Sequence, residues 1–395
     1  MTYGRDFSIA LLIIATTSVV NHMLGFSLPL LALEMSGEGS DLALIKGAGF
    51  VPNVLFAIFI GVINDRMLKA QAFRRYGLGI ALVTLLLCGA MVFDKISIVG
   101  LALFIVVFNG LQYAIGNAQM GLLRLTVAQD RLSDATALTS TVFSVIATAG
   151  PAVAGFMLLS LGHVGLVTFC AAVMMLSAAL SFFLSPAEML PKPTPFWPSL
   201  AEGVRVLSQN RELVMMTVVI VLTNAAAGAF ETALILKMKT GLALDEFTIG
   251  LVVAAAGVGA VVFSRIAAPA RRWLGYRAAF FWPILMLAGV YLMLIEDWPI
   301  WALAAISFLE GGLSLFFAIG VWSYRQESTE AQHIGRVAGL TGAIFKLGMP
   351  PVIILAGVMT DAGHVSQVFV MAAGINISAA LFLVYVAGWG WPVRV

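Results

Sequence analysis

Residues 97–123 read SIVGLALFIVVFNGLQYAIGNAQMGLL, a run without a charged side chain. About 20 mostly apolar residues carry a helix across the hydrocarbon core of a bilayer, and inside lipid the backbone must bond to itself. The run shows no alternation of polar and apolar residues, so it predicts a transmembrane helix rather than a strand. Its amides Asn109, Gln112 and Gln119 recur at spacings of three and seven, so we expect them on one helix face, with Tyr113 close by.

Runs of this kind continue along the whole chain of 395 residues. Hydrophobic residues make up 61% of it and charged residues 11%, and the mean hydropathy is +1.01. A soluble domain carries about 25% charged residues, so the bilayer is the solvent that fits this composition. The sequence therefore predicts an all-α membrane protein with twelve transmembrane helices. Their expected ranges are 7–33, 42–63, 74–93, 97–123, 136–160, 164–184, 213–236, 247–265, 276–295, 299–322, 337–359 and 367–390.

The basic residues favour one orientation of these helices. With the N-terminus in the cytoplasm, seventeen of the 22 Lys and Arg residues fall in cytoplasmic segments, and three fall in outside loops. Such an excess of Lys and Arg is typical of the cytoplasmic side. We therefore expect a multi-pass protein of the cytoplasmic (inner) membrane, with both termini in the cytoplasm.

A polar, proline-rich seam interrupts the apolar runs at residues 185–212, which read SPAEMLPKPTPFWPSLAEGVRVLSQNRE. We expect this seam to be a cytoplasmic linker, with a surface helix around 198–208. It would join two six-helix bundles, an N-terminal one of residues 1–184 and a C-terminal one of residues 213–395.

The two halves also look like repeats of one another. ALTSTVF at 137–143 matches GLTGAIF at 339–345 with an offset of 202, and Gly155 and Gly357 keep the same offset. Two pseudo-symmetric repeats around a central site are a plan that transporters use. Chance similarity between apolar helices is the alternative explanation.

The loop between the second and third expected helices carries a motif. From Gly61 it reads GVINDRMLK, which resembles the G-x-x-x-D-R loop motif of the major facilitator superfamily. The resemblance implies the major facilitator fold, with Gly61, Asp65 and Arg66 in gating contacts that form in one conformation and break in the other. The alternative is that Arg66 only enforces topology.

A second motif, GPAVAG, begins at Gly150 and Pro151 in the fifth expected helix. It resembles the G-P-x-x-G-G motif of exporters in the same superfamily, and so implies export and a gating role for Gly150 and Pro151. Glycine and proline also kink helices and allow close packing in general, so a generic kink is the alternative.

Two longer stretches resemble one branch of the superfamily, the enterobactin exporters and macrolide-efflux proteins. They are TGLALDEFTIGLVVAAAGVGA from Thr240 and GRVAGLTGAIFKLGMPPVIILAGVMTDAGH from Gly335. The resemblance implies export of siderophores, macrolides or other amphipathic molecules, usually in exchange for protons.

Among the charged residues inside the expected helices, four that lie away from the helix ends stand out: Lys46, Glu231, Glu310 and Lys346. A charge at mid-bilayer costs about 2.5–3.5 kcal/mol on insertion scales, so such residues are usually paired or functional. Glu310 and Lys346 lie near the middle of consecutive antiparallel helices, which predicts a pair. The pair is either static, or Glu310 takes up a proton while Lys346 binds an anionic group. Lys46 could instead snorkel to the outer interface, and Glu231 shares a helix face with Asn224.

Further polar residues complete the expected cavity. In the resembled fold the first, fourth, seventh and tenth helices line it. The first and tenth of these contribute Asn21, His22, Ser307 and Ser314. Hydrogen bonding between helices is the alternative role for any one of these side chains.

Together these features predict a secondary active transporter that works by alternating access. The chain lacks the G-x-x-x-x-G-K-[ST] pattern of ATP-binding loops. We therefore expect protons to drive transport, with Glu310 and Glu231 as the coupling carboxylates. The preferred function is export of a siderophore-like or other polar amphipathic molecule. A multidrug or macrolide efflux pump and an importer of a siderophore or metabolite remain open.

Other classes of protein fit the sequence poorly. No nucleophile with a base and no metal ligands occur at the required spacing, so we expect no enzyme, no metal site and no cofactor. The net charge is only +2 and the basic residues are dispersed, which argues against a nucleic-acid partner. The expected partners are a small-molecule substrate, protons and the lipid bilayer, and we expect a monomer.

Overall fold

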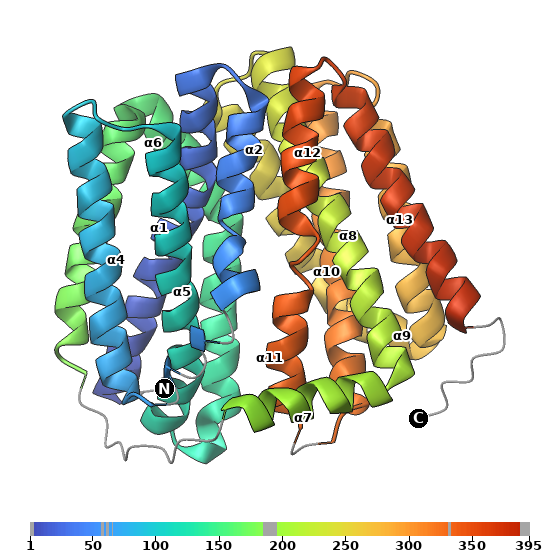
Figure 1. Cartoon of the computed structure of the whole chain (residues 1–395), viewed down its shortest axis with the longest axis horizontal. Coiled ribbons are helices and arrows are strands. Elements are labelled where there is room, and N and C mark those ends of the chain that lie inside the picture. The colour runs from blue at the N-terminus through green and yellow to red at the C-terminus, as the bar shows by residue number, and fades with distance from the viewer. Residues whose placement is uncertain are drawn as a thin grey trace. The chain divides into compact units, whose positions relative to one another are not determined.

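The computed structural model describes residues 4–56, 59–60, 63–64, 66–184, 196–330 and 333–387 (Figure 1). All regular secondary structure in these ranges is helical, as the sequence predicts. The elements up to the linker are α1 (Arg5–Ser36), α2 (Gly39–Ala48), η1 (Pro52–Phe56), α4 (Lys69–Val92), α5 (Ile98–Thr126), η2 (Gln129–Arg131) and α6 (Leu132–Ser181). Those that follow are α7 (Phe196–Gln209), α8 (Arg211–Leu236), η3 (Lys237–Gly241), α9 (Glu246–Met293), α10 (Ile300–Glu327), α11 (Ile334–Ile344), α12 (Met349–Asp361) and α13 (Val365–Ala387).

Nine helices in the described ranges are long and apolar enough to cross a membrane. The number rises to ten if the bent pair Pro269–Gly275 and Ala278–Met293 counts as one span. The chain is therefore a multi-pass, all-helical membrane protein. This count is lower than the predicted twelve partly because α6 counts once although it contains two of the predicted ranges.

α6 and α9 are each much longer than one crossing requires. α6 has 50 residues, which as a straight helix at 1.5 Å per residue would reach about 75 Å, against a hydrocarbon core of about 30 Å. Each helix is interrupted by one glycine with a positive φ, Gly162 at 66° and Gly275 at 76°. Glycine tolerates this left-handed conformation because it has no Cβ. Both breaks fall between ranges that the sequence predicts as separate spans.

Two predicted spans are themselves broken. In the range 42–63, α2 ends at Ala48 and is followed by the π-helical turn η1. In the range 337–359, α11 ends before a turn at residues 345–348, and α12 begins with prolines close to its N-terminus. Proline has no N–H and crowds the preceding turn, so it starts a helix more readily than it continues one. This break leaves Lys346 on a turn instead of within a helix.

The contacts between residues divide the chain into two units. The first comprises Met1–Gly37, Ala48–Thr194 and Asp245–Gly250, and the second comprises Glu38–Gly47, Pro195–Leu244 and Leu251–Val395. Each unit therefore includes one short segment that lies in the other half of the sequence.

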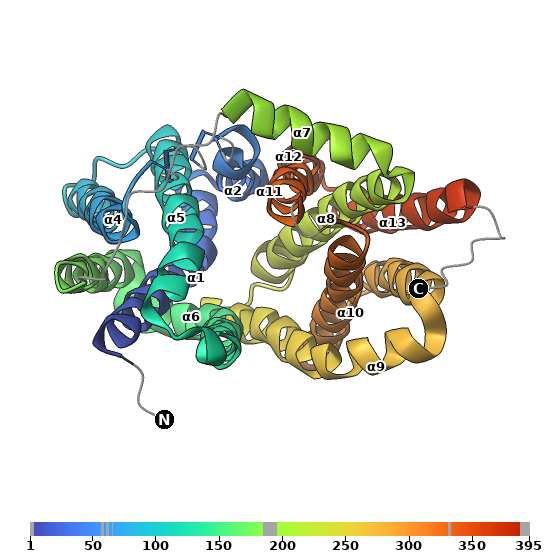
Figure 2. The same ribbon diagram turned by 90° about the horizontal axis from the view of Figure 1, so that it is seen from below.

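Within the first unit, α1 packs along α6, and α4 packs on both α5 and α6 (Figure 2). Phe7, Leu123 and Ala135 form a small buried cluster of α1, α5 and α6. The unit is thus held by apolar side chains that face one another, while the exposed faces of the same helices are also apolar, as lipid contact requires.

Within the second unit, α8 packs against α12 and α13. The core of this unit contains Phe280 of α9, whose ring lies edge-on to the rings of Phe317 and Tyr324 of α10. α7 occupies the place of the surface helix that the sequence predicts, and it lies beside α11 (Figure 2), where Leu207 and Val337 share a buried cluster.

Candidate functional site

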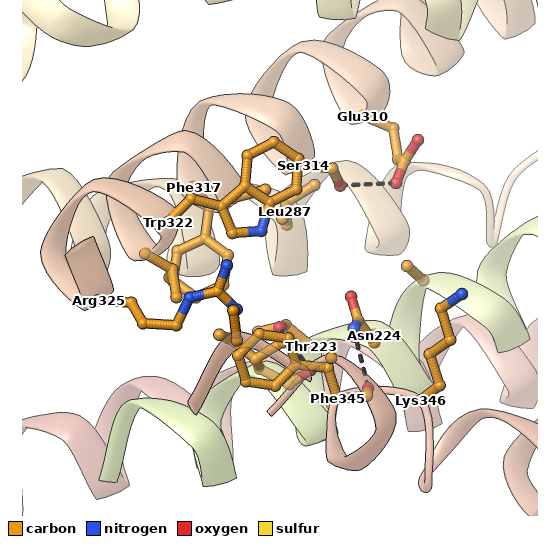
Figure 3. Close-up of a pocket in the computed structure, with 16 residues that line it drawn as sticks. Thr223, Asn224, Leu287, Glu310, Ser314, Phe317, Trp322, Arg325, Phe345 and Lys346 are labelled. Atoms are coloured by element: carbon orange, nitrogen blue, oxygen red, sulfur yellow. Dashed lines mark hydrogen bonds between the residues drawn. The ribbon is translucent and has the colours of Figure 1, made fainter. Parts of the chain in front are cut away.

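The second unit encloses a pocket of about 440 Å³ (Figure 3). Volumes of about 300–1,000 Å³ are typical of small-molecule sites. Polar and charged side chains line it from three elements, α8, α10 and the turn after α11, and aromatic side chains lie between them. The principal lining residues are Thr223, Asn224, Leu287, Glu310, Ser314, Phe317, Trp322, Arg325, Phe345 and Lys346.

One end of the pocket holds four residues that the sequence analysis singled out. Glu310 accepts a hydrogen bond of 2.8 Å from the hydroxyl of Ser314, one turn further along α10. Asn224 donates its side-chain N–H to the carbonyl of Phe345 at 2.9 Å, which fixes the broken turn against α8. Lys346 follows on that turn, so it reaches the same end of the pocket as Glu310 (Figure 3). The ion pair between Glu310 and Lys346 stays a prediction, but the two residues share one chamber.

The other end of the pocket is formed by Arg325 and aromatic rings. Arg325 donates to the hydroxyl of Thr341 at 3.0 Å, and its guanidinium carbon lies 6.0 Å from the centre of the Phe345 ring. Trp322 lies beside it (Figure 3). From the sequence, Arg325 is only one of the seventeen Lys and Arg residues assigned to cytoplasmic segments. Its helix periodicity could have identified it, because residues 310, 314, 317, 321 and 325 fall on one face of α10.

Lys46 and Glu231 form an ion pair in the second unit, with 2.9 Å between Nζ and Oε1. The Lys46 side chain is 10% exposed and that of Glu231 is 52% exposed. Sequence analysis identified both residues but not their pairing, because no local pattern connects α2 with α8. The contact also gives Lys46 a role other than snorkelling to an interface.

The same short helix, α2, is docked by its N-terminus. The carboxylate of Asp361, at the end of α12, accepts the backbone N–H groups of Gly39 at 2.5 Å and Ser40 at 2.8 Å. A Cβ added to Gly357 would lie 2.5 Å from the Cβ of Ala43, so α12 and α2 approach closely because this residue has no side chain. The segment of residues 39–47 is therefore held on α8 and α12 by polar contacts at both ends and by close packing between them.

A comparable close approach occurs in the first unit, between α6 and the start of α9. A Cβ on Gly155 would collide with the backbone of Glu246 and Phe247. Gly155 and Gly357, which sequence analysis paired by their common offset, thus both mark close helix crossings. A Cβ on Gly150 would lie 2.7 Å from the Cβ of His22 on α1, so the glycine of the GPAVAG motif also serves packing.

The start of α9 carries its own cap. Asp245 accepts hydrogen bonds from the backbone N–H of Thr248 at 2.9 Å and from its hydroxyl at 2.7 Å. These bonds stabilise the ionised carboxylate and hold the pKa of Asp245 below its usual value.

The remaining polar residues of the predicted cavity belong to other surroundings. In the first unit, Gln112 donates to the Thr17 carbonyl of α1 at 3.0 Å, and Asn109 bonds within its own helix. Gln119 is buried, whereas Tyr113, Asn21 and His22 are partly buried, and His22 bonds to the Ser18 carbonyl of its own helix. In the second unit, Ser307 is 2% exposed and lies before Glu310 on α10. The pocket of Figure 3 is lined by residues of the second unit.

The loop motif is described only in part. Gly61 and Asp65 lie outside the described residues, while Arg66 is exposed. In the same loop, Asn64 is 3% exposed. Its side-chain N–H donates to the Ala114 carbonyl at 2.8 Å, and its side-chain oxygen accepts a hydrogen bond from the Tyr76 hydroxyl at 2.8 Å. Asn64 therefore anchors the loop on α4 and α5, a role that sequence analysis did not assign.

Comparison with known proteins is consistent with this architecture. Residues 9–353 match the protein-family model described as Major Facilitator Superfamily. No curated protein sequence matches the chain. Among solved structures, the nucleoside transporter NupG superposes with a TM-score of 0.71 at 13% identity, covering 96% of this chain and 99% of that one. The POT family transporter PepTSo superposes with a TM-score of 0.75 at 12% identity, covering 98% of each chain. At such identities these two structures share the fold.

Proposed function

Because the chain belongs to the major facilitator superfamily, a superfamily of membrane transporters, we propose that it is a proton-coupled exporter of a polar amphipathic small molecule. Membrane transport without enzymatic chemistry follows from the family itself. The direction, the coupling ion and the class of substrate are the proposed part.

The proposed topology has twelve crossings in two six-helix bundles, residues 1–184 and 213–395, joined by the linker 185–212. The breaks at Gly162 and Gly275 support it, since each divides an overlong element into two lengths suited to a bilayer. The distribution of Lys and Arg supports cytoplasmic termini in the inner membrane.

The observation that carries the proposal is the pocket with Glu310 in it. A carboxylate inside the membrane is expensive unless it is paired or used, and this one shares a small-molecule-sized chamber with Lys346, Asn224 and Ser314. We propose that the substrate binds there and that Glu310 carries the proton. Glu231 is the second candidate carrier, but its contact with Lys46 suits a structural or gating role better.

Alternating access requires contacts that form in one state and break in the other. We propose that the docking of residues 39–47 on α8 and α12 is such a contact. Asp361 at the N-terminus of α2 and the Lys46–Glu231 pair are polar and partly exposed, so they can exchange with water when the segment leaves. Gly61, Asp65, Arg66, Gly150 and Pro151 are proposed gating residues on the strength of their motifs.

Export, and a siderophore-like substrate, are proposed from the resemblance to the enterobactin-exporter and macrolide-efflux branch at Thr240 and Gly335. A multidrug pump is the second candidate, because Phe317, Trp322 and Phe345 line the pocket together with one carboxylate. Aromatic rings and a carboxylate are a combination that binds lipophilic cations.

Flux in oriented vesicles tests the proposal. Inverted membrane vesicles with an imposed proton gradient are given a catecholate siderophore, a macrolide or a cationic dye in parallel. Gradient-dependent accumulation of the siderophore supports siderophore export. Accumulation of only the dye or the macrolide would instead show that the protein is a drug-efflux pump. Accumulation in right-side-out vesicles instead would reverse the direction.

The role of Glu310 as the proton carrier is tested in the same vesicles. Glu310→Gln should abolish gradient-driven flux but keep exchange of labelled for unlabelled substrate, because the site remains while the proton has no carrier. Glu327→Gln is the matched control; it removes a carboxylate from the same helix, where Glu327 pairs with Arg271 at 2.9 Å. Unchanged gradient-driven transport in Glu310→Gln would remove Glu310 as the carrier.

A further inference from the structure

Arg325 is a cation in the pocket that has no acidic partner among the residues that the structure describes. Its guanidinium donates to Thr341 at 3.0 Å, while its Nε is buried and makes no hydrogen bond within the described residues. Nor does any carboxylate in the part of the chain that the structure describes lie within ion-pair distance of Arg325. Among the described residues, the polar contacts of Arg325 are thus confined to the neutral hydroxyl of Thr341.

A guanidinium without an acidic partner is suited to bind an anionic group. Buried donors nearly always have a partner, and a buried charge is usually paired. The charged side chains that line the pocket are those of Arg325, Lys346 and Glu310. Glu310 lies at the opposite end from Arg325 (Figure 3). A ligand with a negative charge would give the Arg325 guanidinium the acidic partner that it lacks among the described residues.

The chemistry of arginine narrows the kind of anion. Its planar fork matches the two oxygens of a carboxylate, which gives bidentate hydrogen bonds that a compact ammonium cannot make. Thr341 holds one terminal nitrogen in place, and the Phe345 ring lies beneath the guanidinium at 6.0 Å. The fork is therefore oriented in advance, which reduces the entropy lost when a ligand binds.

The surroundings of Arg325 indicate what the rest of the ligand is. Phe317 and Phe345 are 4% and 7% exposed, and together with Trp322, which is 46% exposed, they line the pocket beside the guanidinium. Flat aromatic walls favour a flat aromatic ligand through stacking and edge contacts. Beyond them, Asn224 and Ser314 offer polar groups at the Glu310 end (Figure 3).

We propose that the pocket binds an aromatic carboxylate, with the carboxylate on Arg325, the ring among Phe317, Trp322 and Phe345, and a polar substituent directed towards Asn224. This inference rests on the proposed function in taking the same pocket as the substrate site. It assigns Arg325 as the residue that selects for the charge of the substrate.

Binding to the purified full-length protein in lipid nanodiscs tests the assignment, with 4-hydroxybenzoate and its neutral isostere 4-hydroxybenzamide as probes in isothermal titration calorimetry. In the unmodified protein the carboxylate should bind about tenfold or more tightly than the amide, as expected for charge-assisted bidentate bonds. Arg325→Gln should bring the two affinities within about twofold of each other, because both probes then meet a neutral amide. Arg325→Lys, which keeps the charge without the fork, should retain part of the preference.

Arg205→Gln serves as the control, because Arg205 is an exposed cation on α7 outside the pocket. It should leave both affinities unchanged. Equal affinities in the unmodified protein, a preference that survives Arg325→Gln, or no binding of either probe would each overturn the assignment.

The same probes separate this inference from the proposed function. Charge-selective binding without gradient-driven flux in vesicles would reject proton-coupled export and leave the anion site standing. Gradient-driven flux of a cationic or neutral substrate, with no binding of 4-hydroxybenzoate, would reject the anion site and leave the transporter standing.

Discussion

Replacing Asp361 with alanine should loosen α2 from α12 by a predictable amount. The carboxylate accepts two backbone N–H groups, from Gly39 at 2.5 Å and Ser40 at 2.8 Å. A hydrogen bond to a charged group contributes about 1.5–3 kcal/mol to stability. The second bond is exposed to solvent, so we take the lower value, about 1.5 kcal/mol, for the two together. That free energy corresponds to about a tenfold increase in the population of the undocked segment.

Hydrogen–deuterium exchange of the α2 peptide measures this population. The amides of Gly39 and Ser40 lose their acceptor directly, so the informative amides are those of residues 43–46, which bond within α2 and exchange when the segment opens. Their exchange should be about tenfold faster in Asp361→Ala than in the unmodified protein. Asp361→Asn keeps one acceptor oxygen but no charge, and should give an intermediate rate.

Asp41→Asn is the charge control for this experiment, because Asp41 lies in the first turn of the same helix. Loss of its interaction with the helix dipole should change exchange by only about twofold. Exchange in Asp361→Ala that equals that of the unmodified protein, or that of Asp41→Asn, would refute the view that this carboxylate docks α2.

Three further predictions follow from the described contacts. Gly357→Ala should lower the thermal unfolding midpoint in detergent, since its Cβ would lie 2.5 Å from a side chain of α2 and overpacking costs about 1–3 kcal/mol; Gly374→Ala, with open space around it, should not lower the midpoint. Lys46→Glu and Glu231→Lys should each destabilise the protein to chemical denaturation, and the double exchange should recover part of the loss, whereas strictly additive losses would contradict the pair. Asp245→Asn should lower the midpoint at neutral pH, because the folded-state pKa of Asp245 is depressed by hydrogen bonds from the first turn of α9. The difference between Asp245→Asn and the unmodified protein should then shrink as the pH falls below about 4, where the unfolded carboxylate and then the folded one become protonated; a difference independent of pH would contradict this cap.

Local sequence predicts much of the fold because hydropathy is a local property. Long apolar runs identify membrane helices whatever they pack against, and the positions where helices turn back, near Gly162 and Gly275, appear as gaps between runs. The surface helix of residues 196–209 is similarly predictable, because its polar and apolar residues recur with the period of a helix.

The candidate site could be predicted in part. Glu310 and Lys346 stand out because a charge in an apolar run is costly, and the structure brings both to one pocket with Asn224. Arg325 was not predicted as a pocket residue because it lies at the end of its helix, where a basic residue ordinarily marks the cytoplasmic side. Its place on the same face of α10 as Glu310 could have indicated the pocket, and the packing of α10 against its neighbours shows that the side chain lines it.

The sequence by itself determined that this protein resides in a membrane, that it is built from helices and where most of these helices begin and end, because each of those properties depends on neighbouring residues. The tertiary structure alone decided which polar residues meet: Lys46 with Glu231, Asp361 with the start of α2, and Arg325 with an aromatic pocket. Lipid-embedded helices are apolar on nearly every side, so their hydropathy does not reveal which way each helix is rotated or which partner it contacts, and those choices depend on side-chain packing between segments far apart in the chain.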